Sequence, residues 1–223
     1  ILKNNRNIIY NVMTCLSFRD RYYLCITNKD YFENKFKKYK HQELIKINFE
    51  DNLLTKKWKN IKFKMDLLFT NITDVSMLGN IHTLDLSWSQ YITDVSMLGN
   101  IHTLNLENCQ NIKDISMLGN VNTLKLRNCK NITDISMLGN IHTLKLINCQ
   151  NIKDVSMLCN VHTLNLSNCK NITDVSMLGH NLNLSYTNIK DVSMLGNVHI
   201  LNLHCCVNIK DVSTLGNVNT LNL

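Results

Sequence analysis

The hydrophobic positions of this chain repeat with a fixed period from about residue 62 to residue 223. The clearest marker is an aspartate followed by Val-Ser or Ile-Ser, and successive copies lie 20 residues apart except for one step of 17. The marker aspartates are Asp74, Asp94, Asp114, Asp134, Asp154, Asp174, Asp191 and Asp211. Self-similarity at such a period predicts a solenoid, in which one small structural unit is stacked many times.

One unit, residues 161–180, shows which elements the repeat predicts. Leu164 and Leu166 alternate with polar residues, which predicts a short strand over residues 163–167. Twenty residues are too few for a strand and a full helix, so we expect an extended return segment or a single 3-10 turn. One unit buries too little apolar surface to fold alone. The strands of successive units are therefore predicted to pair in one parallel sheet.

The same unit carries a family resemblance. The positions that recur from unit to unit follow the spacing LxLxxCxxITD, which resembles cysteine-containing leucine-rich repeats, and the Ile-Thr-Asp-Val-Ser-x-Leu half resembles short internalin-type repeats. The resemblance implies a right-handed solenoid with a parallel β-sheet on its concave face and short 3-10 or extended segments on its convex face. The residues that carry it in this unit are Leu164, Leu166, Cys169, Ile172 and Asp174.

Two units depart from the pattern. Residues 179–189 lack three positions of the repeat, and we expect a local kink there. Cys159 replaces a glycine that the other units keep. If that glycine has a positive φ, Cys159 is strained; otherwise the position does not need a positive φ.

The N-terminal residues predict a small helical head. Apolar residues recur at helical spacing over residues 8–16, and Ser17-Phe18-Arg19-Asp20 has the form of a capping box that opens a second helix through Tyr31. A helix pair this small buries its own apolar surface poorly. We expect it to dock on the solenoid, on a partner, or on both.

Residues 6–40 resemble an F-box, in an apolar first helix, a Leu-Ser-x-x-Asp turn and an aromatic end after a basic residue. An F-box followed by leucine-rich repeats implies a substrate-recognition subunit of a cullin–RING (SCF-type) ubiquitin ligase, which docks on a Skp-type adaptor. The type is familiar from giant viruses and AT-rich protists, whose codon bias fits the abundance of Asn, Lys and Ile. The implied adaptor-binding residues are Ile9, Val12, Met13, Leu16, Phe18 and Leu24.

The alternative hypothesis is a stand-alone leucine-rich-repeat scaffold or decoy, with a helical N-terminal cap in place of the F-box. Either hypothesis gives an α+β chain of three parts: an F-box-like helical domain at 1–43, a connector at 44–61 and the solenoid at 62–223. The two hypotheses differ in whether the apolar stripe of residues 8–24 is exposed to solvent or buried against the first coils.

The charge is distributed unevenly between the head and the repeats. The net charge of +7 divides into +8 on residues 1–70 (15 Lys/Arg, 7 Asp/Glu) and −1 on residues 71–223 (9 Lys/Arg, 10 Asp/Glu). A basic head can contact nucleic acid or an acidic protein. Its densest stretch, residues 35–40, fits a solvated helix face, so we expect a protein partner and no nucleic acid. No apolar run approaches the ~20 residues of a membrane helix.

Four polar residue types recur in columns, because equivalent positions of a solenoid stack at strand spacing. We interpret the aspartates as turn caps and not as a calcium site, since one carboxylate per coil falls short of 6–8 oxygen ligands. We interpret the histidines as surface residues, the asparagines as buried amides that bond adjacent coils, and the cysteines as small buried hydrophobes. The columns are His82, His102, His142, His162 and His199; Asn80, Asn100, Asn120, Asn140 and Asn160; and Cys109, Cys129, Cys149 and Cys169.

No phosphate loop, nucleophile motif or CxxC pair occurs, so we expect no enzyme activity, no metal and no cofactor. The many free thiols fit a reducing compartment, which predicts an intracellular, cytoplasmic or nuclear location. Function is expected where exposed columns vary, which is the outward side of the strands. The residues predicted to bind a partner on this concave face are Asp85, Trp88, Glu107, Lys125, Arg127, Lys145, Ile147 and His204. A drifted, solvated surface is the competing interpretation.

Overall fold

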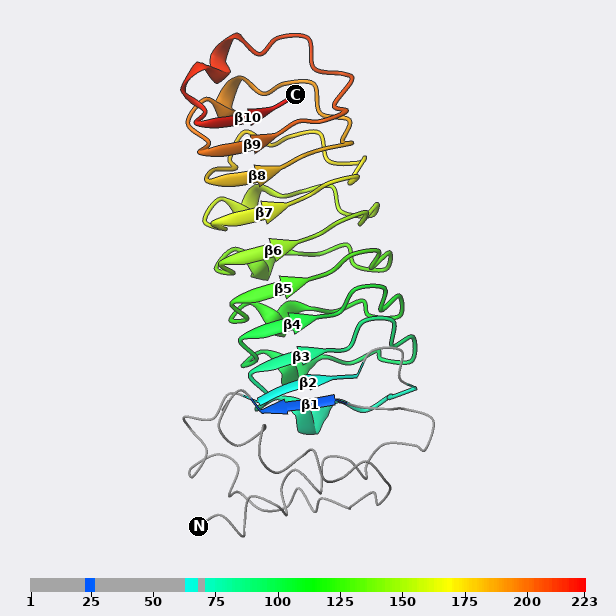
Figure 1. Cartoon of the computed structure of the whole chain (residues 1–223). Coiled ribbons are helices and arrows are strands. Elements are labelled where there is room, and N and C mark those ends of the chain that lie inside the picture. The colour runs from blue at the N-terminus through cyan, green and yellow to red at the C-terminus, as the bar shows by residue number, and fades with distance from the viewer. Residues whose placement is uncertain (1–22, 27–62, 68–70) are drawn as a thin grey trace.

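The computed structural model describes residues 23–26, 63–67 and 71–223, and these form one ten-stranded sheet with its strands in chain order (Figure 1). Strands β2 to β10 are parallel, and each residue pairs with its equivalent in the next unit, as Leu104 does with Leu124. The strands are β1 (Tyr23–Ile26), β2 (Phe63–Asp66), β3 (Thr83–Asp85), β4 (Thr103–Asn105), β5 (Thr123–Lys125), β6 (Thr143–Lys145), β7 (Thr163–Asn165), β8 (Asn181–Asn183), β9 (Ile200–Asn202) and β10 (Thr220–Asn222). The predicted stack of short parallel strands is confirmed.

Each return segment except the one between β7 and β8 carries one short 3-10 turn, which is one of the two forms that the length of the unit predicted, and the described ranges contain no α-helix. None of these turns could span a membrane. The turns are η2 (Ser76–Leu78), η3 (Ser96–Leu98), η4 (Ser116–Leu118), η5 (Ser136–Leu138), η6 (Ser156–Leu158), η7 (Ser193–Leu195) and η8 (Ser213–Asn217). The small helical head that we predicted falls mostly on residues outside the described ranges.

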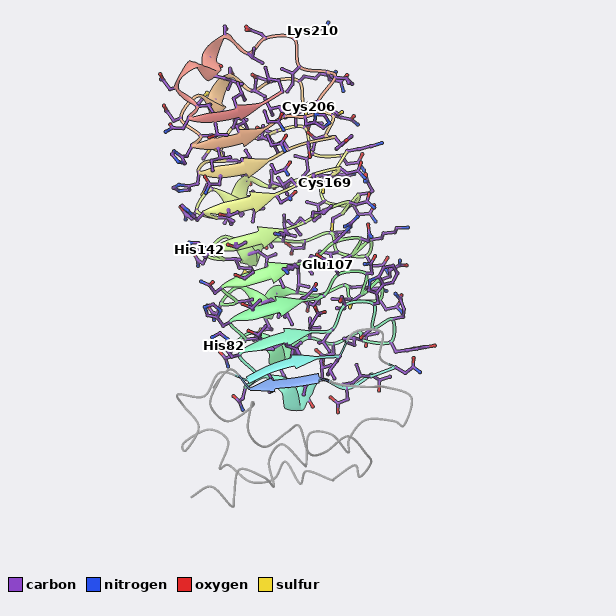
Figure 2. The ribbon with its side chains drawn as sticks, in the orientation of Figure 1. His82, Glu107, His142, Cys169, Cys206 and Lys210 are labelled. Carbon is purple, nitrogen blue, oxygen red and sulfur yellow. The ribbon has the colours of Figure 1, made fainter. Side chains whose placement is uncertain are left out.

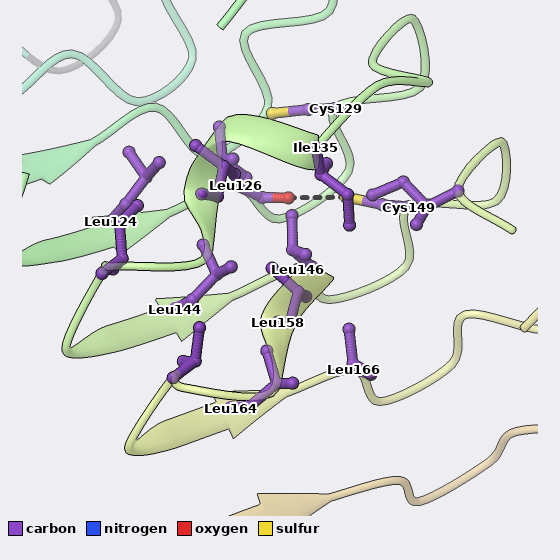
Figure 3. Packing of buried hydrophobic residues seen from close by; sticks show 14 of the residues in the cluster. Leu124, Leu126, Cys129, Ile135, Leu144, Leu146, Cys149, Leu158, Leu164 and Leu166 are labelled. Atoms are coloured by element: carbon purple, nitrogen blue, oxygen red, sulfur yellow. Dashed lines mark hydrogen bonds between the residues drawn. The ribbon is translucent and has the colours of Figure 1, made fainter. Parts of the chain in front are cut away.

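The core is one continuous apolar column between the sheet and the turns. In coil after coil the middle leucine of the strand and the leucine two residues later point inward, as Leu144 and Leu146 do (Figure 3). Main-chain hydrogen bonds continue beyond the strands, for example from Leu126 N to Lys145 O at 2.7 Å. Because each coil contacts its neighbours through both the core and these bonds, the stack stabilises units that cannot fold alone.

The N-terminal edge of the sheet differs from the prediction. Tyr23–Ile26, which we expected in a second helix, forms β1 and pairs antiparallel with β2, with Leu24 opposite Met65. The helical prediction is therefore wrong for these four residues. Aromatic and β-branched residues favour strands, and β2 would otherwise present a row of unpaired N–H and C=O groups. Pairing with that edge outweighs the local helical pattern.

The recurrent glycine is required by close packing and not by its φ. None of the glycines has a positive φ, and Gly119 has φ −59°. A Cβ added at Gly119 would lie 2.5 Å from the carbonyl oxygen of Met137 in the next coil. The turns of adjacent coils thus approach too closely for a side chain. The glycine position does not need a positive φ, so Cys159 is not strained by its main-chain conformation.

The short unit explains why Cys159 is tolerated. Two of the three missing residues lie between Asp174 and β8, and the segment that should form a 3-10 turn there does not form one. Cys159, with φ −58°, faces this altered turn, and the following Gly179 has no atom within 4 Å of an added Cβ. The sheet runs through the short unit in register, with Leu164 opposite Leu182. The deletion is therefore absorbed on the turn side.

Candidate protein-binding face

The outer side of the sheet, called the strand face below, consists of three columns whose members are exposed or half-buried except for the buried Ser87 and Ser185. They lie outward because the leucines between them are buried. The first column is nearly all threonine; the second and third vary from coil to coil. The second column holds Asp85, Asn105, Lys125, Lys145, Asn165, Asn183 and Asn202, and the third holds Ser87, Glu107, Arg127, Ile147, Ser167, Ser185 and His204.

Most members of the second column stabilise their own coil. The Asn165 side-chain oxygen accepts a hydrogen bond from the main-chain N–H of Ser167 at 2.9 Å. The same bond joins Asn105 to Glu107 N (3.1 Å), Asn183 to Ser185 N (3.0 Å) and Asn202 to His204 N (2.9 Å). At the N-terminal end Asp85 accepts the equivalent bond from Ser87 N at 2.9 Å. This column is therefore structural wherever it holds Asn or Asp.

Two adjacent coils break this column with lysine. Lys125 and Lys145 are opposite each other in the paired strands β5 and β6, and Arg127 lies two residues beyond Lys125. We call Lys125, Arg127 and Lys145 the basic cluster. Within the described ranges none of the three has a carboxylate within ion-pairing distance, and Ile147 provides a half-exposed apolar side chain beside them.

The other residues predicted on this face are dispersed. Asp85 accepts a hydrogen bond from the Asn105 amide at 2.9 Å, so its carboxylate is already engaged. Trp88 is 45% exposed on the rim and has a φ of 64°. Three coils separate each of Trp88 and His204 from Ile147, about 14 Å at strand spacing. The structure therefore brings together Lys125, Arg127, Lys145 and Ile147, with Glu107 one coil away, but not the whole predicted set.

Of the predicted adaptor-binding residues, five lie outside the described ranges. They are Ile9, Val12, Met13, Leu16 and Phe18. The sixth, Leu24, lies in β1 at the edge of the sheet.

The aspartate column caps the turns, as predicted. Asp114 Oδ1 accepts a hydrogen bond from Ser116 N at 2.9 Å, and each of the eight aspartates makes the same bond in its own coil. The main-chain bond from Ser116 lowers the pKa of Asp114 below its ordinary value, with a further lowering by the serine side chain. No group of three potential ligands among His, Cys, Asp and Glu occurs within the described ranges.

The histidine column lies where the strands begin, whereas Glu107 lies where they end (Figure 2). The rings of His82 and His102 stack, with centroids 4.5 Å apart at an angle of 12°, whereas those of His142 and His162 are tilted by 33° at 4.8 Å. The sequence interpretation missed His180, which the shortened unit brings beside His162, with ring centroids 5.3 Å apart. These rings are mostly exposed, in agreement with surface positions.

The cysteine column is buried, as predicted, and it also donates hydrogen bonds. The Cys149 thiol donates to Leu126 O of the preceding coil at 2.7 Å (Figure 3). Burial raises the pKa of the Cys149 thiol to about 12, so it stays protonated at neutral pH. The same hydrogen bond, from a thiol to a main-chain oxygen of the preceding coil, joins Cys109 to Leu86, Cys129 to Leu106, Cys169 to Leu146 and Cys206 to Leu184.

The asparagine prediction is wrong for the column that begins at Asn80, because those side chains are exposed after the turn. The inward positions there are taken by apolar residues. Two other columns join the coils instead. Asn128 has a φ of 57° and donates to the Asn108 side-chain oxygen at 2.6 Å, while Asn131 donates to the main-chain oxygen of Gln110 at 2.7 Å. The residue after LxLx, where Asn tolerates a left-handed conformation, is the signal that could have found the first column.

Comparison with solved structures identifies repeat proteins of the same architecture. Internalin C2 from Listeria monocytogenes is 28% identical over 72% of this chain and 80% of its own, with a TM-score of 0.59. An internalin (InlF) from the same organism is 18% identical over 70% and 66%, and the functional domain of InlJ, described as including a cysteine ladder, is 17% identical over 70% and 56%; both have TM-scores of 0.32. No protein-family profile and no curated protein matches the chain. The repeat sequence, the stacked parallel strands and the likeness to internalin C2 together establish the fold of residues 63–67 and 71–223 as a leucine-rich-repeat solenoid.

Proposed function

We propose that the chain is a protein-binding module and that its strand face holds the partner. One observation carries this proposal: the third column of the strand face changes from acidic to basic to apolar in successive coils, at Glu107, Arg127 and Ile147, whereas the exposed turn-side column of Lys113, Thr133 and Lys153 only alternates between Lys and Thr. Elsewhere the repeated columns have structural roles, as the capping aspartates and the buried thiols do. Lys125, Arg127, Lys145 and Ile147 have no such role in the described structure, and they lie together.

The shape of this face suits a polypeptide better than a small molecule. Nine parallel strands at ~4.8 Å spacing make an open surface roughly 40 Å long. The larger depression described on the turn side, lined by Asp94, Asp114 and Met117 among others, has a volume of about 230 Å³. Small-molecule sites are typically enclosed and of ~300–1,000 Å³. Long open surfaces of solenoids are typical binding surfaces for other proteins.

A selection of random peptides displayed on phage, with the whole chain as bait, tests the proposal. We expect the selected peptides to lose binding to Lys145→Asn/Ile147→Ser, which introduces the residues that the next coil carries at these positions. They should keep binding to Met117→Thr/Met137→Thr on the turn side, where the last coil carries Thr214. Peptides that depend on the turn-side residues, or no selected peptides at all, would contradict a binding role for the strand face.

The finer proposal is that the module recognises substrates for an SCF-type ubiquitin ligase in an intracellular, reducing compartment. It is supported by the F-box resemblance of residues 6–40 alone. Binding of a purified Skp-type adaptor to the whole chain, abolished by Val12→Asp/Leu16→Asp, would support it. A folded wild-type chain that does not bind the adaptor would contradict it.

The competing proposal is a stand-alone leucine-rich-repeat scaffold or decoy with an N-terminal cap. The pairing of β1 with β2 favours this alternative, because a strand at the sheet edge covers the first coil as a cap does. Leu24, which the F-box resemblance assigns to the adaptor interface, lies in that strand. The adaptor-binding experiment therefore distinguishes between the two proposals.

A further inference from the structure

We infer that the basic cluster recognises an acidic peptide segment of the partner, with carboxylate oxygens taking the place of asparagine oxygens that the scaffold lacks in these two coils. This inference rests on the proposed function and names the chemistry of its ligand. It is carried by missing main-chain hydrogen bonds and by an unbalanced group of charges.

The missing hydrogen bonds follow from the two lysines. In four other coils an asparagine oxygen accepts the main-chain N–H two residues later, at 2.9–3.1 Å. A lysine side chain has no acceptor atom. The main-chain N–H groups of Arg127 and Ile147 consequently lack this partner. In their own coils these residues occupy the position at which Glu107 and Ser167 donate to an asparagine. Ile147 is half-buried and Arg127 is exposed. An unmade hydrogen bond at a half-buried site costs free energy, so an oxygen supplied by a ligand would be most favourable at the Ile147 N–H.

The charges around these N–H groups are unbalanced. Lys125 and Lys145 face each other across paired strands, and like charges in that position destabilise a sheet. Glu107 lies in the coil next to Arg127, but the two form no ion pair within 4.0 Å in the described structure. Asp85 lies farther away and is engaged by Ser87 and Asn105. Three cations thus face one nearby free carboxylate, and the two main-chain groups that lack a partner, the N–H groups of Arg127 and Ile147, are both donors.

The neighbourhood favours a short acidic peptide over a nucleic acid. Residues 71–223 have a net charge of −1, with 9 Lys/Arg and 10 Asp/Glu, so a long polyanion gains little beyond the cluster. A nucleic acid would also approach the carboxylates of Asp85 and Glu107. Ile147 adds an apolar contact beside the cations, which suits a peptide with a hydrophobic residue next to its acidic ones.

The chain itself provides an informative variant. Lys125→Asn/Lys145→Asn introduces the residue that neighbouring coils carry, so it should restore both main-chain hydrogen bonds and remove the like-charge contact. We expect this variant to unfold at a urea concentration no lower than the wild type, and yet to bind an acidic peptide about tenfold more weakly, through the loss of two charge-assisted contacts. Loss of binding then cannot be attributed to loss of folding.

The experiment is fluorescence anisotropy on the whole chain with three labelled probes: Glu-Glu-Glu-Glu-Leu, Gln-Gln-Gln-Gln-Leu and a short single-stranded oligothymidine. The matched control is Lys113→Thr/Lys153→Thr, which removes the same charge from the turn side and introduces the Thr that other coils carry, as at Thr133. Binding of the glutamate probe that weakens with salt, is lost in the asparagine variant and is kept in the control would support the inference.

Four outcomes would overturn it: no binding of the glutamate probe, equal binding of the glutamine probe, unchanged binding by the asparagine variant, or tighter binding of the oligothymidine. The phage selection separates this failure from failure of the proposed function. Selected peptides that need the strand face but lack acidic residues would leave the binding role standing and remove only the acidic ligand.

Discussion

Replacing Gly119 with alanine tests how closely the turns of successive coils approach each other. A methyl group added at Gly119 would lie 2.5 Å from the main-chain oxygen of Met137, whereas ordinary van der Waals contact of a Cβ atom begins at 3.4 Å. The turns of the two coils would have to separate by about 1 Å. They cannot do so freely, because the flanking strands are joined by main-chain hydrogen bonds such as Leu126 N to Lys145 O.

Gly119→Ala combines two opposing effects. Overpacking of this kind costs about 1–3 kcal/mol. Replacing glycine with alanine at a compatible φ also reduces the entropy of the unfolded chain, which stabilises the protein by about 0.4–1 kcal/mol. We expect the free energy of unfolding of Gly119→Ala to fall by roughly 1–2 kcal/mol.

Gly179 offers the matched control, because nothing lies within 4 Å of an added Cβ there and its φ is not positive. Gly179→Ala should therefore show only the gain of about 0.4–1 kcal/mol. Since the unfolded-state effect is common to both variants, their difference isolates the clash.

Urea unfolding followed by circular dichroism measures the free energy of unfolding of both variants. An unchanged dependence of that free energy on urea concentration shows that unfolding remains cooperative. Equal midpoints for Gly119→Ala and Gly179→Ala would refute the close approach of the turns as the reason for the repeated glycine. A higher midpoint for Gly119→Ala than for the wild type would refute it more strongly.

Three further predictions concern the stacked columns. Asn128→Ala should destabilise the chain more than Asn128→Gly by about 1 kcal/mol in urea unfolding, because both lose the side-chain bonds to Asn108 and Asn148 but only alanine is strained at φ 57°; equal stabilities would contradict this. In a thiol-labelling experiment at pH 8 read by mass spectrometry, exposed Cys205 should react in the native chain and Cys149 only after unfolding. Burial raises the pKa of Cys149 to about 12 in the folded chain. The contribution of this thiol to the free energy of unfolding is therefore full below the unfolded-state pKa of about 9 and should fall as the pH rises above that value. The pKa values of the capping aspartates, measured by NMR titration, should lie below 3.8 because each carboxylate accepts a main-chain N–H. Their contribution to the free energy of unfolding is present above pH 3.8 and is lost as the pH falls through the lowered pKa values. An aspartate that titrates at or above 3.8 would argue against its cap.

Much of the fold could be predicted because the same hydrophobic pattern and the same turn residues recur in each coil. The alternation around Leu164 and Leu166 predicted the strand, and the 20-residue period predicted an extended return or a single 3-10 turn in place of a helix, of which the structure shows the 3-10 turn in most coils. The capping role of the aspartates followed from one acceptor that precedes a turn in every coil. The burial of Cys149 followed from its column, although the acceptor of its thiol, in the preceding coil, did not.

The site could be predicted only in part. The sequence indicated that Lys125, Arg127, Lys145 and Ile147 are outward and close together, because strand alternation and register suffice for that. It also assigned Trp88 and His204 to the same face, but distances along the stack separate them from the cluster. The unpaired N–H groups of Arg127 and Ile147 could not be expected before the asparagine bonds of neighbouring coils were seen.

The amino-acid sequence by itself determined the period, the strand positions, the turn caps and the inward or outward direction of the strand, cysteine and histidine columns, since all of these depend on residues within one unit. The tertiary structure decided what depends on contacts between units. It placed Tyr23–Ile26 at the sheet edge, because the edge strand β2 presents a row of N–H and C=O groups that a neighbouring strand can pair with. It also decided that Gly119 is needed for the approach of the next turn, because stacking sets the distance between atoms that the sequence places 18 residues apart.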